Sequence, residues 1–267
     1  MQALRVSLVQ GATRWHDPAG NREYYASLIA SLAGRTDLVV LPETFSSGFS
    51  NEAIHNAETM DGPTVAWLKK QAASLDAAVT GSVQLRAGEG QGGATVFNRL
   101  LFVTPDGNVR HYDKRHLFRY ADEHKRYAAG CARLVVEWKG WKICPLVCYD
   151  LRFPVFSRNH HDERGFEYDL VLFVANWPSA RAHAWRTLLR ARAIENLSYC
   201  VGVNRVGTDG NNLPYSGDSA VLDFLGQTMA DLGAQEQTVT VALDPAALAA
   251  FREKFPAWMD ADAFELL

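Results

Sequence analysis

Cysteine is scarce in this chain, and no pattern of Cys and His resembles a metal site. Only four cysteines occur in 267 residues, namely Cys131, Cys144, Cys148 and Cys200. So few cysteines at this length predict no disulfide framework, and we expect a reducing cytoplasm in which a thiol stays available for chemistry. A zinc site would need more Cys and His at ligand spacing. We therefore expect no metal and no cofactor.

Long apolar runs and an excess of basic charge are also missing. No apolar segment approaches the roughly 20 residues that a membrane-spanning helix needs. The opening segment MQALRVSLVQ carries a charge in its middle, which indicates a β-strand and not a signal peptide. The net charge of -3 provides no basic surface for a nucleic acid. Neither a nucleic acid nor a membrane is expected as a partner.

What is present is the composition of an ordinary globular protein. Hydrophobic residues make up 48% of the chain and charged residues 21%. This length supports one large domain or two small ones. Because there is no internal repeat, no low-complexity segment and no linker, we predict a single domain over residues 1–267.

The hydrophobic pattern mixes βα units with β-hairpins. Strands are predicted at 4–10, 37–41, 78–85, 95–103, 142–147, 169–175, 199–204, 219–224 and 238–243. Helices are predicted at 21–32, 63–75, 182–197 and from residue 155 onward. The glycine-rich AGEGQGG is expected as a loop, and TPDGN as a hairpin turn. Continuous apolar strands such as DLVVL and DLVLFVA need cover on both faces. We therefore predict an α/β sandwich, with two sheets packed on each other and helices outside.

Three reactive side chains follow predicted strands. Glu43 ends DLVVLPE, Lys114 follows the strand-like segment NVRHYD, and Cys148 ends WKICPLVC. Ligand sites of α/β folds form beyond the carboxyl ends of strands. A thiol, a carboxylate that takes its proton and an ammonium that stabilises an oxyanion are the groups needed for acyl transfer.

Each of these residues also has a structural interpretation. A cysteine at a strand end is often a small core residue. Glu43 would equally suit a helix cap or the surface, and Lys114 would suit a solvated charge run in YDKRH. Periodicity alone leaves open whether the three side chains meet.

Longer motifs resemble those of the nitrilase superfamily of carbon–nitrogen hydrolases, along essentially the whole chain. LPETFSSGF, YDKRHLF and VCYDLRFP resemble its glutamate, lysine and nucleophile motifs, in the family's order. EHKRYAAG matches the segment of a second, accessory glutamate, and RARAIENLSYCVGVNRVG and SGDSAVLDFLG resemble later segments. The resemblance implies a four-layer α-β-β-α sandwich. It also implies that Glu43 is the general base, Lys114 the catalytic lysine, Cys148 the nucleophile and Glu123 the accessory acid.

Neighbouring residues are expected to take part in the reaction that the resemblance implies. Lys114 and the backbone N–H of Tyr149 would hold the oxyanion while a thioester forms on Cys148. Arg152 offers a fork of donors for a substrate carboxylate, and a structural salt bridge is an equal alternative. Asn176 and Trp177 are expected to line the pocket, although Trp177 would also serve as a core cap beside Pro178.

The expected substrate is a small-molecule amide. Val155 replaces the glutamate that many members carry after RFP, and this variant resembles a bacterial branch associated with ω-amidase activity. The resemblance implies an ω-amide of a short 2-oxo dicarboxylic acid, such as 2-oxoglutaramate or 2-oxosuccinamate. The alternatives are an N-carbamoyl-amino-acid hydrolase, a deaminated-glutathione amidase, a nitrilase, a non-catalytic binding protein, and a thiol redox protein that uses Cys144 and Cys148.

The C-terminal segment FPAWMDADAFELL carries several apolar residues that look exposed. We expect this segment to pack on another subunit. Members of the family are commonly dimers or larger assemblies, so a homodimer or a higher homo-oligomer is predicted.

Overall fold

The computed structural model describes residues 1–90 and 93–265, and within them the chain forms two six-stranded sheets. The first sheet contains, in spatial order, β16 (Gln237–Leu243), β1 (Leu4–Gln10), β2 (Leu38–Val40), β3 (Ala78–Gly90), β4 (Gly93–Val103) and β5 (Val109–Asp113). The second contains β15 (Thr228–Asp231), β14 (Ala220–Leu222), β11 (Tyr199–Asn204), β10 (Leu170–Ala175), β7 (Trp141–Val147) and β6 (Val136–Trp138). Two short hairpins are formed by β8 (His161–Asp162) with β9 (Gly165–Phe166), and by β12 (Val206–Thr208) with β13 (Pro214–Ser216).

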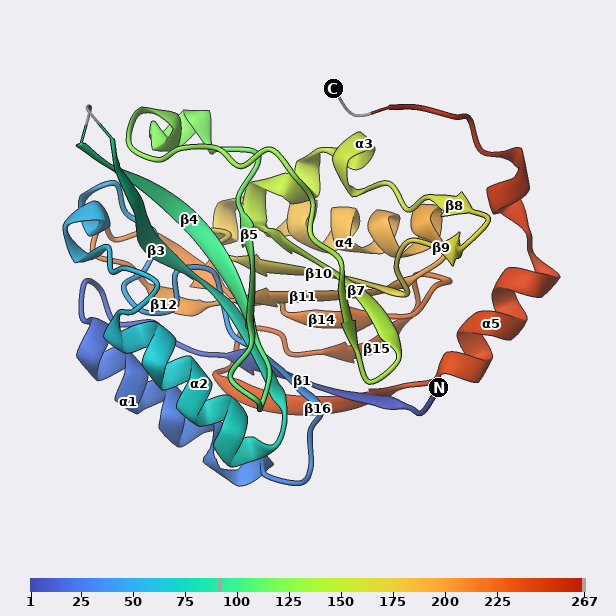
Figure 1. The fold of residues 1–267 in the computed structure, drawn as a ribbon, viewed down its shortest axis with the longest axis horizontal. Coiled ribbons are helices and arrows are strands. Elements are labelled where there is room, and N and C mark those ends of the chain that lie inside the picture. The colour runs from blue at the N-terminus through green and yellow to red at the C-terminus, as the bar shows by residue number, and fades with distance from the viewer. Residues whose placement is uncertain (91–92, 266–267) are drawn as a thin grey trace.

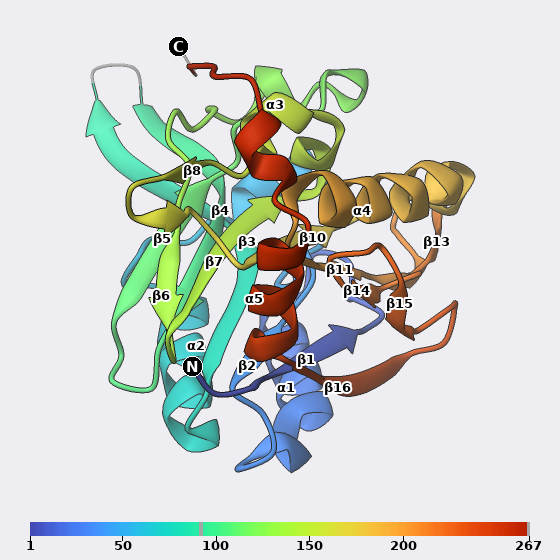
Figure 2. The ribbon, with the colours of Figure 1, turned by 90° about the vertical axis from the view of Figure 1, so that its right-hand side faces the viewer.

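Helices cover the outer faces of the sheets (Figure 1). The helices are α1 (Pro18–Ile29), α2 (Pro63–Leu75), α3 (Pro154–Ser157), α4 (Ala182–Asn196) and α5 (Pro245–Lys254). In Figure 1, α1 and α2 lie side by side outside the first sheet, and α4 lies outside the second. Figure 2 shows α5 crossing one end of the stack. Single 3₁₀ turns occupy Ala30–Leu32, Glu52–Asn56, Arg119–Ala121, Glu123–Lys125, Cys148–Arg152, Ser179–Arg181 and Ala257–Asp260.

The apolar strands are buried on both faces, as their sequences predict. In β2, Leu38 and Val40 pack in a core shared with the second sheet, whereas Val39 packs in a second core. The second core also contains Tyr25 of α1 and Leu68 of α2. Successive side chains of a strand point to opposite faces, so a continuous apolar run fills both cores. The predicted four-layer α-β-β-α sandwich is confirmed.

Several local predictions need correction. The glycine-rich loop is shorter than predicted, because β3 continues to Gly90 and β4 begins at Gly93; residues 91–92 of AGEGQGG lie outside the described residues. The helix predicted from residue 155 is only Pro154–Ser157. There the hydroxyl of Ser157 donates back to the carbonyl oxygen of Pro154 at 3.3 Å, and Arg158 is already extended. Sequence patterning also missed α5, although Asp244 and Pro245 are a cap and first-turn pair.

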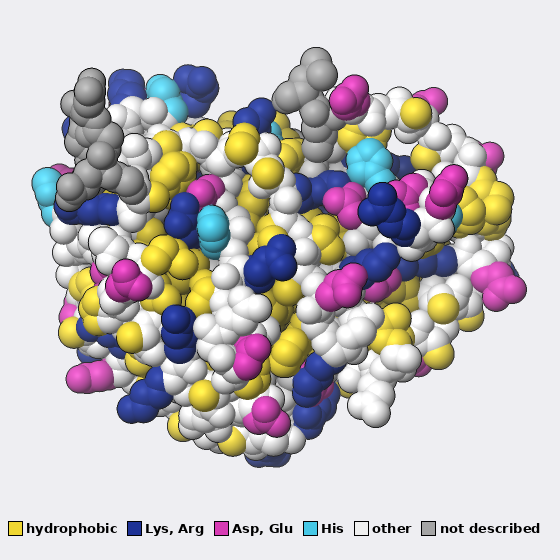
Figure 3. All heavy atoms as spheres, in the orientation of Figure 1, with side chains coloured by type: hydrophobic (Ala, Val, Ile, Leu, Met, Phe, Trp, Pro, Cys, Tyr) yellow, Lys and Arg dark blue, Asp and Glu magenta, His cyan; other side chains and the backbone are white. Residues whose placement is uncertain are grey.

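The surface carries charges of both signs. On the face shown in Figure 3, basic and acidic side chains are interspersed among apolar ones. In the ranges 1–90 and 93–265, no helix is both long and apolar enough to cross a membrane.

Candidate active site

The candidate site lies at one end of the sandwich, where strands of both sheets end. Glu43 follows β2, Lys114 follows β5, Cys148 follows β7, and Asn176 follows β10. In the first sheet β2 is parallel to β3, and two antiparallel steps through β4 make β5 run in the same direction. In the second sheet β7 and β10 are parallel. The carboxyl ends of these strands therefore meet, which the hydrophobic pattern alone had left open.

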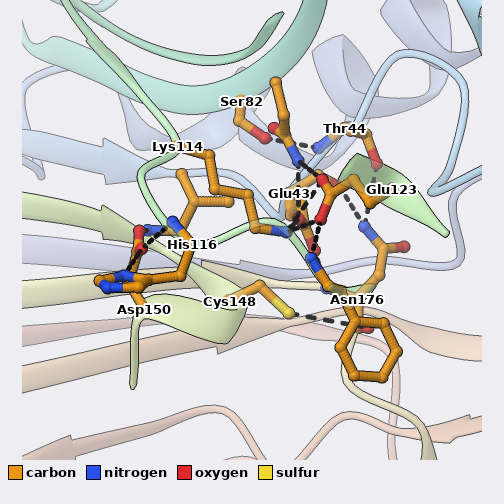
Figure 4. Close-up of polar contacts among 12 residues, drawn as sticks. Glu43, Thr44, Ser82, Lys114, His116, Glu123, Cys148, Asp150 and Asn176 are labelled. Atoms are coloured by element: carbon orange, nitrogen blue, oxygen red, sulfur yellow. Dashed lines mark hydrogen bonds and ion pairs between the residues drawn. The ribbon is translucent and has the colours of Figure 1, made fainter. Parts of the chain in front are cut away.

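A buried cluster of one amine and two carboxylates forms the centre of the site (Figure 4). The Nζ atom of Lys114 lies 2.9 Å from Oε1 of Glu43 and 3.0 Å from Oε2 of Glu123. All three side chains are at most 1% exposed. A buried amine held by two carboxylates is fixed in one position, and its neighbours satisfy its charge. Lys114 is thus not part of a solvated charge run, and Glu43 is not a surface residue.

The electrostatics of the cluster favour a charged lysine. Burial alone would lower the pKa of Lys114, but the negative charges of Glu123 and Glu43 outweigh it and hold that pKa well above its ordinary value. Burial raises the pKa of Glu123, an effect that Lys114 opposes and Glu43 reinforces. The amine is therefore a permanent cation at neutral pH, facing the cavity beside Cys148.

Asn98 of β4 ties the two carboxylates together, and sequence analysis did not single it out. Its Nδ2 donates to Oε1 of Glu43 at 2.8 Å and to Oε1 of Glu123 at 3.3 Å. The available signal was a polar residue inside the apolar strand sequence VFNRLLFV. Because buried polar groups need partners, such a residue predicts a polar neighbour in the core.

Asn176 fixes Glu43 from the second sheet. The backbone N–H of Asn176 donates to Oε2 of Glu43 at 2.8 Å, and its Nδ2 donates to the backbone oxygen of Glu43 at 2.6 Å. The same Nδ2 lies 3.0 Å from Oγ1 of Thr44. Glu43 is therefore held by residues from both sheets, with Lys114 on one carboxylate oxygen and Asn176 on the other.

Cys148 sits at a sharp turn between β7 and a 3₁₀ helix. Val147 has extended backbone, whereas Cys148 has a φ of 45°, in the left-handed region that non-glycine residues seldom adopt. The carboxylate of Asp150 secures the turn, because it accepts hydrogen bonds from the backbone N–H of Val147 and of His116, both at 3.0 Å. It also accepts one from the hydroxyl of Tyr112 at 2.8 Å. Asp150 thus holds the turn.

Cys148 as a whole residue is partly exposed, and its Sγ lies 4.0 Å from the backbone oxygen of Asn176. Burial of the sulfur and the negative charge of Glu43 raise its pKa well above the ordinary value, and Lys114 opposes them. The resting thiol is therefore protonated and needs a base before it can attack. All four cysteines are free, and burial raises the pKa of Cys144 to about 12. A buried, weakly acidic Cys144 does not favour the redox interpretation.

Cys148 opens into a cavity of about 230 Å³. Arg152, Asn176 and Trp177 line it, as predicted, and Tyr149 lies beside the thiol. The guanidinium carbon of Arg152 lies 5.0 Å from the ring centre of Trp177. Among residues 1–90 and 93–265, Arg152 forms no ion pair, so the alternative of a structural salt bridge has no partner.

Sequence analysis missed several other cavity residues, and all of them except Phe118, which ends YDKRHLF, lie outside the catalytic motifs. They come from the loop after β5, from the 3₁₀ turn before α4 and from the segment that contains β13: Phe118, Tyr120, Arg181, Leu213, Pro214 and Tyr215. A single sequence offers no signal for such residues, since only the fold brings these segments together.

Comparison with known proteins identifies the family. A family model described as carbon-nitrogen hydrolase matches residues 5–253. The chain is 48% identical to the omega-amidase YafV of Escherichia coli K12 over 267 residues, which cover all of both chains. It is 32% identical to the 2-oxoglutaramate amidase of Bacillus subtilis 168, with 96% of each chain covered. The crystal structure of XC1258 from Xanthomonas campestris, a CN-hydrolase superfamily protein with an arsenic adduct in its active site, matches over all of both chains with a TM-score of 0.97 and 65% identity. The chain therefore belongs to the carbon–nitrogen hydrolase family.

Proposed function

We propose that this protein is an ω-amidase that hydrolyses the ω-amide of a short 2-oxo dicarboxylic acid, such as 2-oxoglutaramate or 2-oxosuccinamate. The observation that carries the proposal is the buried Glu43–Lys114–Glu123 cluster, which shares one cavity with the thiol of Cys148. Family membership supports amide hydrolysis. Relatives named omega-amidase and 2-oxoglutaramate amidase support the choice of substrate.

In the proposed acylation step, Glu43 accepts the proton of the Cys148 thiol and the thiolate attacks the amide carbon. A base is needed because the pKa of this thiol is raised. The carbonyl oxygen becomes an oxyanion, which the ammonium of Lys114 and the backbone N–H of Tyr149 stabilise. Glu43 then gives the proton to the leaving nitrogen, the C–N bond breaks, and ammonia departs. The acyl group remains on Cys148 as a thioester.

Hydrolysis of the thioester reuses the same groups. Glu43 takes a proton from a water molecule, and the resulting hydroxide attacks the thioester carbon. The same donors stabilise the second oxyanion, the C–S bond breaks, and Cys148 regains a proton from Glu43. The product is a carboxylic acid. Each turnover thus consumes one amide and one water and releases one ammonia.

The supporting residues are proposed to position these groups. Glu123 holds the ammonium of Lys114 toward the cavity. Asn176 and Trp177 form one wall of the pocket, and Arg152 binds a substrate carboxylate. The cytoplasmic location, the single domain over residues 1–267, the homo-oligomer and the absence of a cofactor or metal remain predictions.

The test is ammonia release from a small panel of compounds. The panel contains 2-oxoglutaramate, 2-oxosuccinamate, glutamine, asparagine, an N-carbamoyl amino acid and a nitrile, each with wild type, Cys148→Ala and Cys144→Ser. We expect release confined to the 2-oxo acid amides, abolished by Cys148→Ala and retained by Cys144→Ser. Ammonia release from the carbamoyl compound or the nitrile alone would show that the proposed substrate is wrong. Release by Cys148→Ala would overturn the nucleophile.

A further inference from the structure

Arg181 lines the cavity, and hydrogen bonds fix its backbone. It ends the 3₁₀ turn Ser179–Arg181, directly before α4. Its backbone N–H donates to the carbonyl oxygen of Pro178 at 2.9 Å, and its carbonyl oxygen accepts the indole N–H of Trp177 at 2.8 Å. Both backbone groups are therefore engaged, and the base of the side chain is fixed in the wall that Trp177 forms.

Aromatic rings hold the guanidinium of Arg181. Its guanidinium carbon lies 5.2 Å from the ring centre of Phe118 and 6.0 Å from that of Tyr120. Ring faces attract a cation but leave its N–H donors free at the edge of the guanidinium plane. Arg152 is held in the same way by Trp177. Two cations are thus positioned by rings at one cavity.

Neither guanidinium has an anionic partner within the described residues. Elsewhere arginines pair with carboxylates, as Arg99 does with Asp113 at 2.7 Å and Arg252 with Asp169 at 2.7 Å. No ion pair or side-chain hydrogen bond of Arg152 or Arg181 occurs in residues 1–90 and 93–265. Of the described residues that line the cavity, Glu43 is the sole carboxylate, and Lys114 already pairs with it. Two guanidiniums in the described part of the cavity can therefore bind an anion, whereas the one carboxylate there is already paired with Lys114.

We propose that Arg181, together with Arg152, binds the 2-oxo acid end of the substrate and selects 2-oxo acid amides over amino acid amides. The inference rests on the proposed function and names the residue that determines its specificity. A 2-oxo carboxylate presents three acceptor oxygens in one plane, which two forked donors share. The α-ammonium of glutamine or asparagine would instead meet two like charges, with no free carboxylate nearby to compensate.

The experiment compares wild type with Arg181→Gln, Arg181→Lys and the matched control Arg35→Gln. Arg35 is exposed in the loop before β2, at the opposite end of that strand from Glu43. We measure kcat and KM for 2-oxoglutaramate, the rate of any ammonia release from glutamine, and competitive inhibition by the product 2-oxoglutarate. Arg181→Gln should raise KM for 2-oxoglutaramate and weaken inhibition roughly tenfold to hundredfold, with a much smaller change in kcat. It should also narrow the preference for 2-oxoglutaramate over glutamine.

The two other variants sharpen the interpretation. Arg181→Lys keeps the charge but loses the fork, so KM should fall between wild type and Arg181→Gln. Arg35→Gln removes the same charge from the surface and should leave both constants unchanged. If Arg181→Gln lowered kcat while KM and inhibition stayed at wild-type values, Arg181 would be structural and this inference would be wrong. If wild type released ammonia from neither compound, the proposed function would be wrong as well.

Discussion

At the scale of single residues, the carboxamide of Asn98 is the contact that keeps two buried carboxylates together. It donates to Glu43 and Glu123 at once, and each of these also binds Lys114. Without it, both carboxylates lose a donor while remaining buried. Truncation of Asn98 should therefore disturb the position of Glu43, the proposed base, more than it disturbs substrate binding.

We expect Asn98→Ala to lower kcat roughly tenfold to hundredfold, the cost of about one hydrogen bond to a charged group. KM should change much less, because Asn98 does not line the cavity. Steady-state kinetics on 2-oxoglutaramate would check this, with the exposed Asn211→Ala as control. Equal kinetics for Asn98→Ala and Asn211→Ala would contradict the positioning role.

The pH dependence of kcat/KM should report on Glu123. Burial raises its pKa, so as the pH falls Glu123 takes up a proton earlier than an ordinary glutamate would. Activity should therefore decline on the acid side at a pH above about 4.3, the ordinary value for glutamate. Glu123→Gln should lower the plateau and move the acid limb. If the acid limb of the pH profile stayed at the same pH in Glu123→Gln as in wild type, the limb would belong to another titratable group.

The site residues that the sequence indicated stand in a long motif or directly after a predicted strand. Glu43, Lys114 and Cys148 each stand in a long motif after a strand, so their meeting followed from resemblance and from the rule about strand ends. Asn98 and Arg181 stand in segments without a motif. Their roles depend on which strands and loops become neighbours, and spacing along the chain does not encode that.

At the scale of elements, the turn after β7 presents the thiol. Asp150 is fully buried and accepts hydrogen bonds from Val147, Tyr112 and His116, so its carboxylate fastens the turn to the segment after β5. The ring of His116 contributes a further contact, with Nδ1 at 2.8 Å from Oδ1 of Asp150. The strained φ of Cys148 persists because this network determines the path of the turn.

We expect Asp150→Asn to destabilise the protein by about 1.5–3 kcal/mol and to reduce kcat, because an amide accepts on one oxygen only. Thermal unfolding and single-turnover kinetics would measure the two effects. The exposed Asp260→Asn serves as the matched control and should leave both nearly unchanged. A variant Asp150→Asn with wild-type melting temperature and kcat would show that the turn does not depend on the carboxylate.

The element pattern was largely readable from the chain, with two instructive failures. The long apolar strands and α1, α2 and α4 were predicted close to their observed bounds, because both faces of each strand and one face of each helix are buried. The short α3 ends early because the hydroxyl of Ser157 donates to the backbone oxygen of Pro154 in the same helix. Helix α5 has one buried apolar residue, Leu248. A helix that buries so few apolar side chains shows only a weak hydrophobic periodicity in its sequence.

At the scale of the whole molecule, Asp37 links the two sheets. Its carboxylate binds the guanidinium of Arg5 in β1 at 2.9 Å and the amine of Lys139, between β6 and β7, at 2.6 Å. The indole of Trp138 donates to its backbone oxygen at 2.8 Å. Burial would raise the pKa of Asp37, but the hydrogen bonds from Arg5 and Lys139 outweigh it and hold the pKa well below its ordinary value.

Asp37→Asn should lower the melting temperature at neutral pH. Because the folded-state pKa is depressed, the stabilisation by Asp37 is complete above the unfolded value of about 3.9 and is lost as the pH falls through the folded value. The difference between wild type and Asp37→Asn should therefore shrink below about pH 3.9. Melting curves from neutral to acid pH would measure it. A difference that stays constant as the pH falls below about 3.9 would exclude the charge of Asp37 as its cause.

The C-terminal segment exposes large apolar side chains. Phe255 and Met259, in the segment expected to pack on another subunit, are 54% and 67% exposed. A surface of this kind is consistent with the predicted homo-oligomer, which stays a prediction. Sequence reveals that such residues are apolar, but only a partner's surface defines where they pack.

The most direct test of the account is to look for the acyl group on the thiol. Wild-type protein is mixed with 2-oxoglutaramate, quenched in acid during turnover, digested and weighed by mass spectrometry, with Cys144→Ser as control. We expect an acyl adduct on the peptide that carries Cys148, in both proteins, and none after the substrate is exhausted. Rapid ammonia release with Cys148 unmodified at every time point, or with the adduct on another residue, would contradict this expectation.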